Sequence, residues 1–300
     1  MNHAGSSNKV ISITRNLSDK KDSDSLRQKK KTNTRVIAIT SGKGGVGKTN
    51  IVANLGFALS RLRKKVLVLD ADLGLGNLDV LLGIAPKYNL SHVVAGEKSI
   101  SDIIVKGPGE MKILPAGSGI QEITDLSRDQ KIRILSELDT LLDTVDILLI
   151  DTAAGISSNV MYFNVSAQNI IVVATPEPTS MTDAYALMKV LSMRYSEKKF
   201  SLLVNLAASV EEAHEVFRQL DLVAKRFLDI SIEYIGYVLA DKNVTKGVRH
   251  QKIVSELYPD TIASRCFATL AEKVCKLPPP KFPKGDAKIF WKSLVQNKFA

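Results

Sequence analysis

Cysteine and histidine are scarce in this sequence, which holds two Cys and four His among 300 residues. Cys266 and Cys275 lack C-x-x-C spacing and have no histidine beside them, so we predict neither a cysteine metal site nor a redox site. No apolar run approaches the roughly 18 residues of a membrane-spanning helix, and no signal-peptide core follows the N-terminal charges. We therefore expect a cytoplasmic protein whose thiols stay reduced.

Positive charge is concentrated at the two ends of the chain. Residues 1–35 carry nine Lys or Arg against three Asp, and residues 276–300 carry six Lys against one Asp, so the middle is nearly neutral. Basic tails suit an anionic membrane or an acidic partner better than a broad nucleic-acid groove, so we expect no direct nucleic-acid binding. Tails that are merely solvated are the alternative. We expect residues 1–35 to be largely disordered because they combine high charge with few apolar side chains.

Continuous apolar runs alternate with stretches of helical spacing. The predicted strands are residues 36–40, 65–70, 146–151, 170–175, 200–205 and 232–239, and residues 48 to about 61 are predicted to form a helix. Runs without polar alternation favour a mostly parallel sheet covered by helices on both faces, the doubly wound α/β class. We place this domain at residues 36–276, a proline-rich spacer at 277–286 and a short amphipathic helix at 287–300.

A phosphate-binding motif follows the first predicted strand. Residues 42–49, GKGGVGKT, satisfy G-x-x-x-x-G-K-[ST] between a strand and a helix, which is the context the motif requires. In such loops backbone N–H groups surround phosphates, the final Lys reaches the terminal phosphates, and the following hydroxyl binds Mg²⁺. We therefore predict ATP and Mg²⁺ as cofactors. The predicted nucleotide-binding residues are Gly42, Lys43, Gly44, Gly45, Val46, Gly47, Lys48, Thr49 and Asn50.

Polar residues end three further predicted strands, where ligands bind in doubly wound folds. Asp70 and Asp72 end one strand; a carboxylate there can orient water for attack on a γ-phosphate. Asp151 suits a contact to Mg²⁺, and with Thr49 and Asp70 it makes up the predicted metal site. Caps of turns or helices are the alternative role for these acids. Asn205 could pair with the adenine edge, although Asn is also common in turns.

Lys43 is one lysine more than a phosphate loop needs. A lysine directly after the first Gly resembles the deviant Walker A box of the MinD and ParA class of P-loop ATPases. This resemblance implies slow ATP hydrolysis and an ATP-bound homodimer in which Lys43 reaches the partner's phosphates. It also implies that Asp72 is the hydrolysis-linked carboxylate, so the predicted catalytic residues are Lys43, Lys48 and Asp72.

Longer strings narrow the resemblance further. DADLGLGNLDVLLG, DTAAGISSNV and ATPEPTSMTDAYALMKVL resemble the FlhG family, also called FleN or YlxH, from about residue 36 to 274. The resemblance implies control of flagellar number and placement. It implies work with the GTPase FlhF, contact with flagellar switch proteins and, in some bacteria, restraint of a flagellar transcription activator. The family's D-Q-A-x-x-L-R motif is incomplete here, where residues 21–27 read KDSDSLR. Residues 180–183 are predicted to cap the helix that follows.

The last 14 residues, AKIFWKSLVQNKFA, predict an amphipathic helix. Phe290, Trp291, Leu294 and Val295 fall on one arc at 100° per residue, which is typical of an interfacial helix. The family resemblance implies membrane targeting, so we expect peripheral association with the inner face of the cell membrane. A helix docked permanently on the domain is the alternative.

Other functions stay open at this stage. A division-site MinD is disfavoured by the basic extension and the TPEPTS string, and a ParA-type DNA-partition motor by the nearly neutral body. A metal-cluster carrier would need cysteine pairs. An ATP-binding protein that only sequesters a transcription activator, with incidental hydrolysis, is a further alternative.

Overall fold

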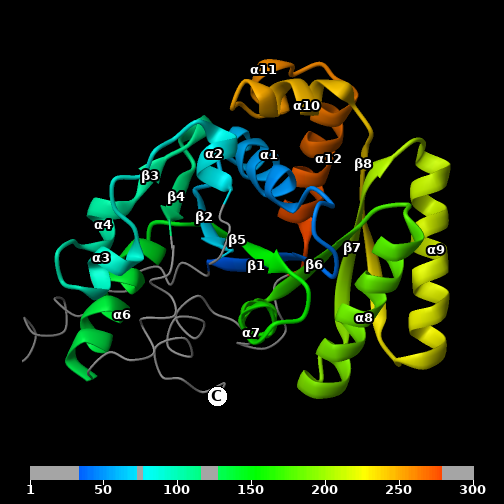
Figure 1. The fold of residues 1–300 in the computed structure, drawn as a ribbon, viewed down its shortest axis with the longest axis horizontal. Helices are drawn as coiled ribbons and strands as arrows, with labels where there is room; N and C mark the ends of the chain where they lie inside the picture. The colour runs from blue at the N-terminus through cyan, green and yellow to red at the C-terminus, as the bar shows by residue number, and fades with distance from the viewer. Residues whose placement is uncertain (1–33, 73–76, 116–127, 279–300) are drawn as a thin grey trace, which may run out of the picture. The chain divides into compact units, whose positions relative to one another are not determined.

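The computed structural model describes residues 34–72, 77–115 and 128–278, and within them the strands form one sheet (Figure 1). Its strand order is β3-β4-β2-β5-β1-β6-β7-β8. Neighbouring strands are parallel except β3 and β4, which are antiparallel. The strands are β1 Arg35–Ser41, β2 Val66–Ala71, β3 Val105–Lys106, β4 Lys112–Pro115, β5 Ile147–Ala154, β6 Asn169–Ala174, β7 Lys199–Ala207 and β8 Ser231–Leu239.

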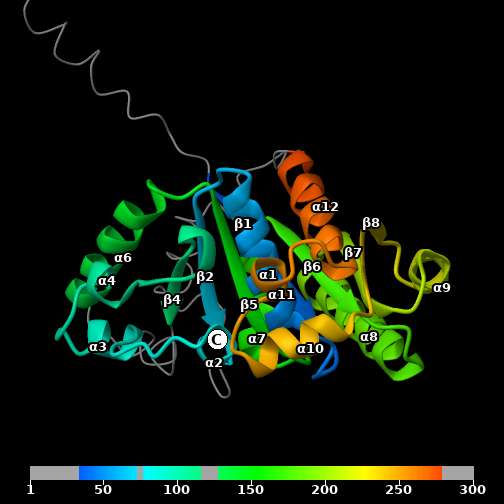
Figure 2. The same ribbon diagram turned by 90° about the horizontal axis from the view of Figure 1, so that it is seen from above.

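Helices cover both faces of this sheet (Figures 1 and 2). One face packs on α1 (Lys48–Arg61) and α12 (Ile262–Lys276), beside the short helices α2 (Leu78–Leu82), α10 (Lys242–Arg249) and α11 (Val254–Leu257). The remaining described helices are α3 (Leu90–Val94), α4 (Ile100–Ile103), η2 (Pro108–Glu110), α6 (Arg128–Leu142), α7 (Ser158–Ser166), α8 (Pro178–Tyr195) and α9 (Val210–Phe227).

The central strand shows why both faces must be covered. Successive side chains of a strand point to opposite faces, and in β1 residues Ile37 and Ile39 belong to the cluster around α1 and α12. Val36 and Ala38 belong to the cluster on the opposite face, with α6 and α7. A third cluster joins β6, β7 and β8 to α8 and α9. The predicted doubly wound, mostly parallel α/β fold is confirmed.

The predicted elements differ from the observed ones mainly at the edge of the sheet that β3 and β4 form. The six predicted strands and the helix over residues 48–61 are present with small shifts at their ends. β3 and β4 were not predicted, because they span two and four residues and include charged Lys106 and Lys112. Such short segments carry no clear periodicity.

The ends of the described domain are anchored by buried and partly buried polar contacts. The Thr34 hydroxyl lies 3.0 and 2.8 Å from the carbonyl oxygens of Leu142 and Val145. The Arg35 guanidinium donates to the carbonyl oxygens of Val274 and Leu277 at 3.0 and 2.7 Å. Thr34 and Leu277 lie just outside the predicted boundaries but are buried. The predicted N-terminal extension, most of the spacer and the C-terminal helix lie outside the described residues. None of the described helices is both long and apolar enough to cross a membrane.

Candidate functional site

The phosphate loop lies between β1 and α1, at the carboxyl edge of the sheet. Gly45 and Gly47 have positive φ angles of 80° and 91°, which favour glycine. Gly47 is the residue before the first turn of α1, so the loop leads directly to a helix N-terminus. A Cβ placed on Gly44 or Gly45 would meet nothing within 4 Å. The loop therefore presents an open backbone surface beside a helix N-terminus, which suits phosphate.

Lys48 points into the site. Its side chain is only 9% exposed, and its Nζ donates to Ser41 Oγ at 2.9 Å. Burial lowers the pKa of Lys48, whereas the nearby Asp151 and Asp72 carboxylates act in the opposite direction. The ammonium group thus lies within electrostatic range of both carboxylates, where it can also meet the phosphates of a bound nucleotide.

Buried Asp151 and half-buried Asp70 form an acidic pair on neighbouring strands. They are direct partners in the register of β2 and β5, and Asp151 is only 2% exposed. Burial, followed by the charge of Asp70, raises the pKa of Asp151 to about 7, although a hydrogen bond from Thr49 acts against this shift. Burial raises the pKa of Asp70 to about 6. The N–H of Asp72 donates to Asp70 Oδ1 at 3.3 Å.

These residues fit a magnesium–nucleotide complex. Oδ1 of Asp151 is buried and has no hydrogen-bond partner among the described residues, and a bound cation would neutralise the acidic pair. The described ranges contain no group of three or more His, Cys, Asp or Glu side chains arranged around a metal. Mg²⁺ commonly keeps waters and binds through one or two protein ligands plus phosphates. Thr49 and Asp151 would hold the cation, and Lys48 would contact the phosphates.

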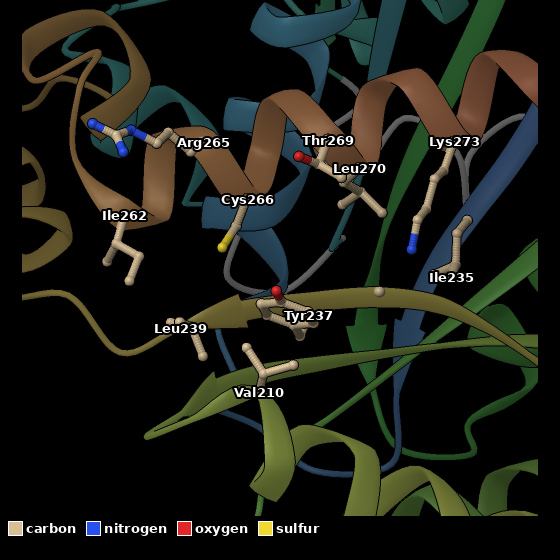
Figure 3. Close-up of a pocket in the computed structure, with 11 residues that line it drawn as sticks. Val210, Ile235, Tyr237, Leu239, Ile262, Arg265, Cys266, Thr269, Leu270 and Lys273 are labelled. Atoms are coloured by element: carbon tan, nitrogen blue, oxygen red, sulfur yellow. The ribbon is translucent and has the colours of Figure 1, made fainter.

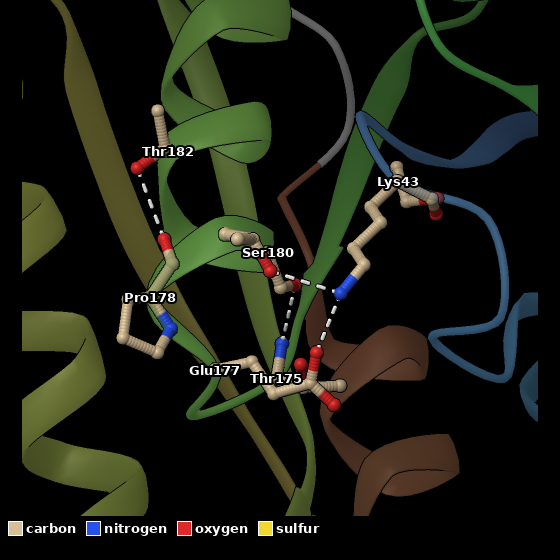
Figure 4. Close-up of polar contacts among 8 residues, drawn as sticks. Lys43, Thr175, Glu177, Pro178, Ser180 and Thr182 are labelled. Carbon is tan, nitrogen blue, oxygen red and sulfur yellow. Dashed lines mark hydrogen bonds and ion pairs between the residues drawn. The ribbon is translucent and has the colours of Figure 1, made fainter.

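Lys43 points toward the start of α8 (Figure 4). Its Nζ donates to Glu177 Oε2 at 2.6 Å and to Thr179 Oγ1 at 2.9 Å. Both partners lie at the start of α8, and the Lys43 side chain is 36% exposed. The two lysines of one loop therefore have different surroundings: one is buried beside carboxylates, and the other lies at the surface.

Comparisons with known proteins agree with this arrangement of the site. A family model described as an AAA domain matches residues 34–204. The antiactivator FleN of Pseudomonas aeruginosa is 43% identical over 263 residues, covering 88% of this chain and 94% of that protein. The flagellum site-determining protein YlxH of Helicobacter pylori is 33% identical over 270 residues, covering 89% and 91%. The chain belongs to the FleN family.

The FleN-family fold is also found in solved MinD structures. MinD of Pyrococcus horikoshii, solved as a complex with Mg-ADP, matches with a TM-score of 0.64 and 26% identity over 81% of this chain and 97% of that one. The resemblance to FlhG, FleN and YlxH that the sequence indicates is therefore confirmed. This FleN-family chain is a P-loop ATPase of the MinD type.

Asn205 braces the phosphate loop in this FleN-family protein. Its buried amide Nδ2 donates to the Val46 carbonyl at 2.8 Å. A Cβ on Gly47 would lie 2.5 Å from the same nitrogen, so the loop glycine leaves room for the amide. Sequence patterns did not predict this contact. Pairing of Asn205 with adenine stays a prediction, as do the roles of Gly42 and Asn50 in nucleotide binding.

The predicted capping box at residues 180–183 is wrong. Helix α8 begins earlier, at Pro178, with Glu177 at the N-cap and no side-chain capping bond. Proline is favoured in the first turn because its fixed φ suits the helix. Ser180 Oγ instead accepts from the N–H of Thr175 at 2.9 Å, which satisfies a donor just after β6. The sequence analysis did not predict Glu177 as a site residue. Its position in the PEPTS string, directly after a predicted strand, was the signal that could have identified it.

The structure leaves some predicted site residues undescribed and shows a cavity away from the phosphate loop. Phe290, Trp291, Leu294 and Val295 lie outside the described residues. A cavity of about 390 Å³ lies between α12 and β8 (Figure 3). Its lining includes none of the predicted nucleotide or metal residues. The ATPase chemistry therefore belongs to the carboxyl edge of the sheet around the phosphate loop.

Proposed function

We propose that this protein is an ATP-dependent dimeric switch that regulates flagellar number and placement. The names of its FleN and YlxH relatives, an antiactivator and a flagellum site-determining protein, support this role. The observation that carries the proposal is that the two lysines of the phosphate loop, Lys43 and Lys48, have different surroundings. Lys48 is buried and donates to Ser41 at the end of β1, whereas Lys43 lies at the surface beside Glu177.

Because their surroundings differ, the two lysines have separate roles. Lys48 and Thr49 serve the nucleotide of their own subunit, and Lys43, which lies outside that site beside Glu177, serves a nucleotide that a second subunit brings to the same surface. Two polyphosphates that face each other repel unless cations lie between them. Two Lys43 ammonium groups and two Mg²⁺ ions supply those cations, so the dimer forms only when both subunits hold ATP.

The ATP state then selects the partners. In the dimer, we propose, the protein works with an FlhF-type GTPase, contacts flagellar switch proteins and restrains a flagellar transcription activator. The dimer also presents two copies of residues 287–300 to the inner face of the cell membrane, where paired weak contacts add avidity. Hydrolysis, with Asp72 positioning the attacking water, returns the protein to monomers.

Light scattering on a sizing column tests the proposal with three variants. Wild-type protein should dimerise with Mg²⁺-ATP and stay monomeric with ADP. Lys48→Ala should lose nucleotide binding, whereas Lys43→Ala should bind ATP and stay monomeric. Asp72→Ala should hold ATP as a dimer because hydrolysis is blocked. A Lys43→Ala protein that dimerises like wild type would overturn the trans role of this lysine.

Flagellar counts in cells connect the switch to its biology. A strain without the gene should gain or misplace flagella, and wild-type protein should restore the normal number. Lys43→Ala should fail to restore it at equal protein level. Asp72→Ala, fixed as the dimer, should suppress flagella below the normal number. Normal counts in the strain without the gene would rule out the flagellar role while leaving the ATPase intact.

A further inference from the structure

We propose that Glu177 and Thr179 form a resting site for Lys43, which opposes dimerisation until ATP is bound. The proposal rests on the proposed role of Lys43 across the dimer and names the group that holds this lysine beforehand. Glu177 and Thr179 would be positioning residues that act through Lys43, the lysine of the phosphate loop that they hold.

The contacts of the resting site are close and specific (Figure 4). Nζ of Lys43 lies 2.6 Å from Glu177 Oε2 and 2.9 Å from Thr179 Oγ1, so one carboxylate and one hydroxyl accept two of its three hydrogens. Hydrogen bonds between ionised groups are typically this short, which marks the Lys43–Glu177 contact as a charge-assisted one. Both acceptors lie at exposed positions at the N-terminal end of α8.

The start of α8 is held firmly against the phosphate loop. A Cβ on Gly42 would lie 2.1 Å from the backbone oxygen of Asp183, so the loop and the first turns of α8 are in direct contact. Ser180 ties the same turn to the residue after β6 through its bond to the Thr175 N–H. Because backbone contacts fix the distance between loop and helix, Glu177 stays within reach of Lys43 and the contact does not depend on a mobile segment.

This contact competes with any use of Lys43 across a dimer. An ammonium group that approaches a partner's phosphates must leave Glu177 and Thr179, and a freed carboxylate would then add negative charge near two polyphosphates. The more highly charged ATP compensates for this loss better than ADP does. Glu177 therefore weakens the dimer more when ADP is bound than when ATP is bound. It thereby increases the preference of the dimer for ATP.

The exposure of the Lys43–Glu177 ion pair sets how much the contact can change the dissociation constant of the dimer. The Lys43 and Glu177 side chains are 36% and 61% exposed, and exposed ion pairs are weak because water screens them. Each dimer breaks two such pairs, one per subunit. Glu177→Gln, which keeps the side-chain shape and removes its charge, should lower the dissociation constant of the ATP dimer about two- to thirtyfold. It should also make dimers detectable with ADP at high protein concentration.

A matched control separates this contact from a general loss of surface charge. Glu110 makes an exposed ion pair with Lys106 at 3.0 Å, away from α8 and the phosphate loop. Glu110→Gln should leave dimerisation unchanged with either nucleotide. Thr179→Ala removes the second acceptor and should shift the dissociation constant in the same direction as Glu177→Gln, by a smaller factor.

Amine labelling tests the resting contact without a dimer. In nucleotide-free protein an acetylating reagent, read by mass spectrometry of the Lys43 peptide, should react slowly with Lys43 because two oxygens cover its Nζ. Labelling should become about twofold or more faster in Glu177→Gln and stay at the wild-type rate in Glu110→Gln. Equal labelling of Lys43 in wild type and Glu177→Gln would overturn the contact.

The two measurements distinguish this proposal from the function on which it rests. If Glu177→Gln labels faster but its ATP dimer is as tight as wild type or weaker, the resting site does not oppose dimerisation and the proposal is wrong. If wild-type protein forms no ATP dimer, the proposed function fails and this proposal fails with it. Faster labelling together with a tighter dimer is the expected result.

Discussion

Asp70 and Asp151 are register partners on the parallel strands β2 and β5. Two carboxyl groups that share a buried edge cannot both ionise without cost, and burial raises their pKa values to about 6 and about 7. In the unfolded chain both would titrate near pH 4. The folded, nucleotide-free protein therefore holds protons over a pH range in which the unfolded chain has released them.

The first prediction follows from this difference in proton binding. As pH rises from about 4 through about 7, the free energy of unfolding of the nucleotide-free protein should fall, since the folded state binds more protons. Asp151→Asn, whose amide can donate to Asp70, should raise that free energy by about 1–3 kcal/mol at pH 8. At pH 5 the gain should be small. Urea denaturation in EDTA at both pH values measures the difference.

Asp260→Asn provides the control, because Asp260 is exposed and lies outside the acidic pair. It should change stability little at either pH. An Asp151→Asn protein that is less stable than wild type at pH 8 would contradict the idea of an uncompensated buried charge. Addition of Mg²⁺-ADP should stabilise wild type more than Asp151→Asn, since the cation needs the carboxylate.

The second prediction concerns the first glycine of the loop. A methyl group on Gly42 would meet backbone oxygen of Asp183 at 2.1 Å, and backbone yields less than a flexible side chain. Gly42→Ala should therefore lower the free energy of unfolding by about 1–3 kcal/mol. Gly44→Ala adds the same methyl group where nothing lies within 4 Å, so it should leave thermal unfolding unchanged. Equal melting temperatures for both variants would refute the packing argument.

The third prediction concerns the brace on the loop. Asn205→Ala would leave the Val46 carbonyl without its 2.8 Å donor in a buried setting, which costs about 1–3 kcal/mol. We expect weaker binding of Mg²⁺-ADP, measured by calorimetry, because the loop is no longer held in its binding shape. Asn54→Ala removes another buried amide, whose Oδ1 accepts from the N–H of Ser255. It should lower stability with less effect on ADP affinity.

The sequence predicts those parts of the fold that rest on local patterns. The strand before the phosphate loop and helix α1 could be located because apolar runs and the glycine-lysine motif are contiguous. β3 and β4 could not, since two to four residues with charged members carry no period. The sequence predicted that Ser180 caps α8, but α8 begins at Pro178. The Ser180 hydroxyl accepts from the N–H of Thr175, just after β6, and not from an N–H of its own helix.

Contacts between distant segments explain the rest of the difference. Lys43 and Glu177 are separated by 134 positions, and their meeting depends on where α8 packs against the loop. The pairing of Asp70 with Asp151 likewise depends on the register of two strands, and a slip of one residue would turn the side chains to the other face. A single sequence gives the residue types of this site but not these distances.

The fourth prediction concerns residues 287–300, which lie outside the described residues, and we propose that they bind membranes when ATP is bound. Trp291 is the only tryptophan in the chain, so its emission reports on this segment alone. Adding anionic liposomes with Mg²⁺-ATP should shift that emission to the blue. Each large apolar side chain contributes about 1.5–3 kcal/mol on burial, but ordering the peptide has a comparable opposing cost. One such segment should therefore bind weakly.

Two such segments on one dimer should bind about 10² to 10⁴-fold more tightly than one, which couples membrane residence to the ATP state. Lys43→Ala, expected to stay monomeric, should thus lose most liposome co-sedimentation although its C-terminal residues are intact. Truncation after Lys284 should lose it as well and should keep the ATP dimer on a sizing column. Equal liposome binding with ATP and ADP would refute the coupling, because a dimer is the source of the avidity. Full binding by the truncated chain would instead assign the membrane contact to another part of the protein.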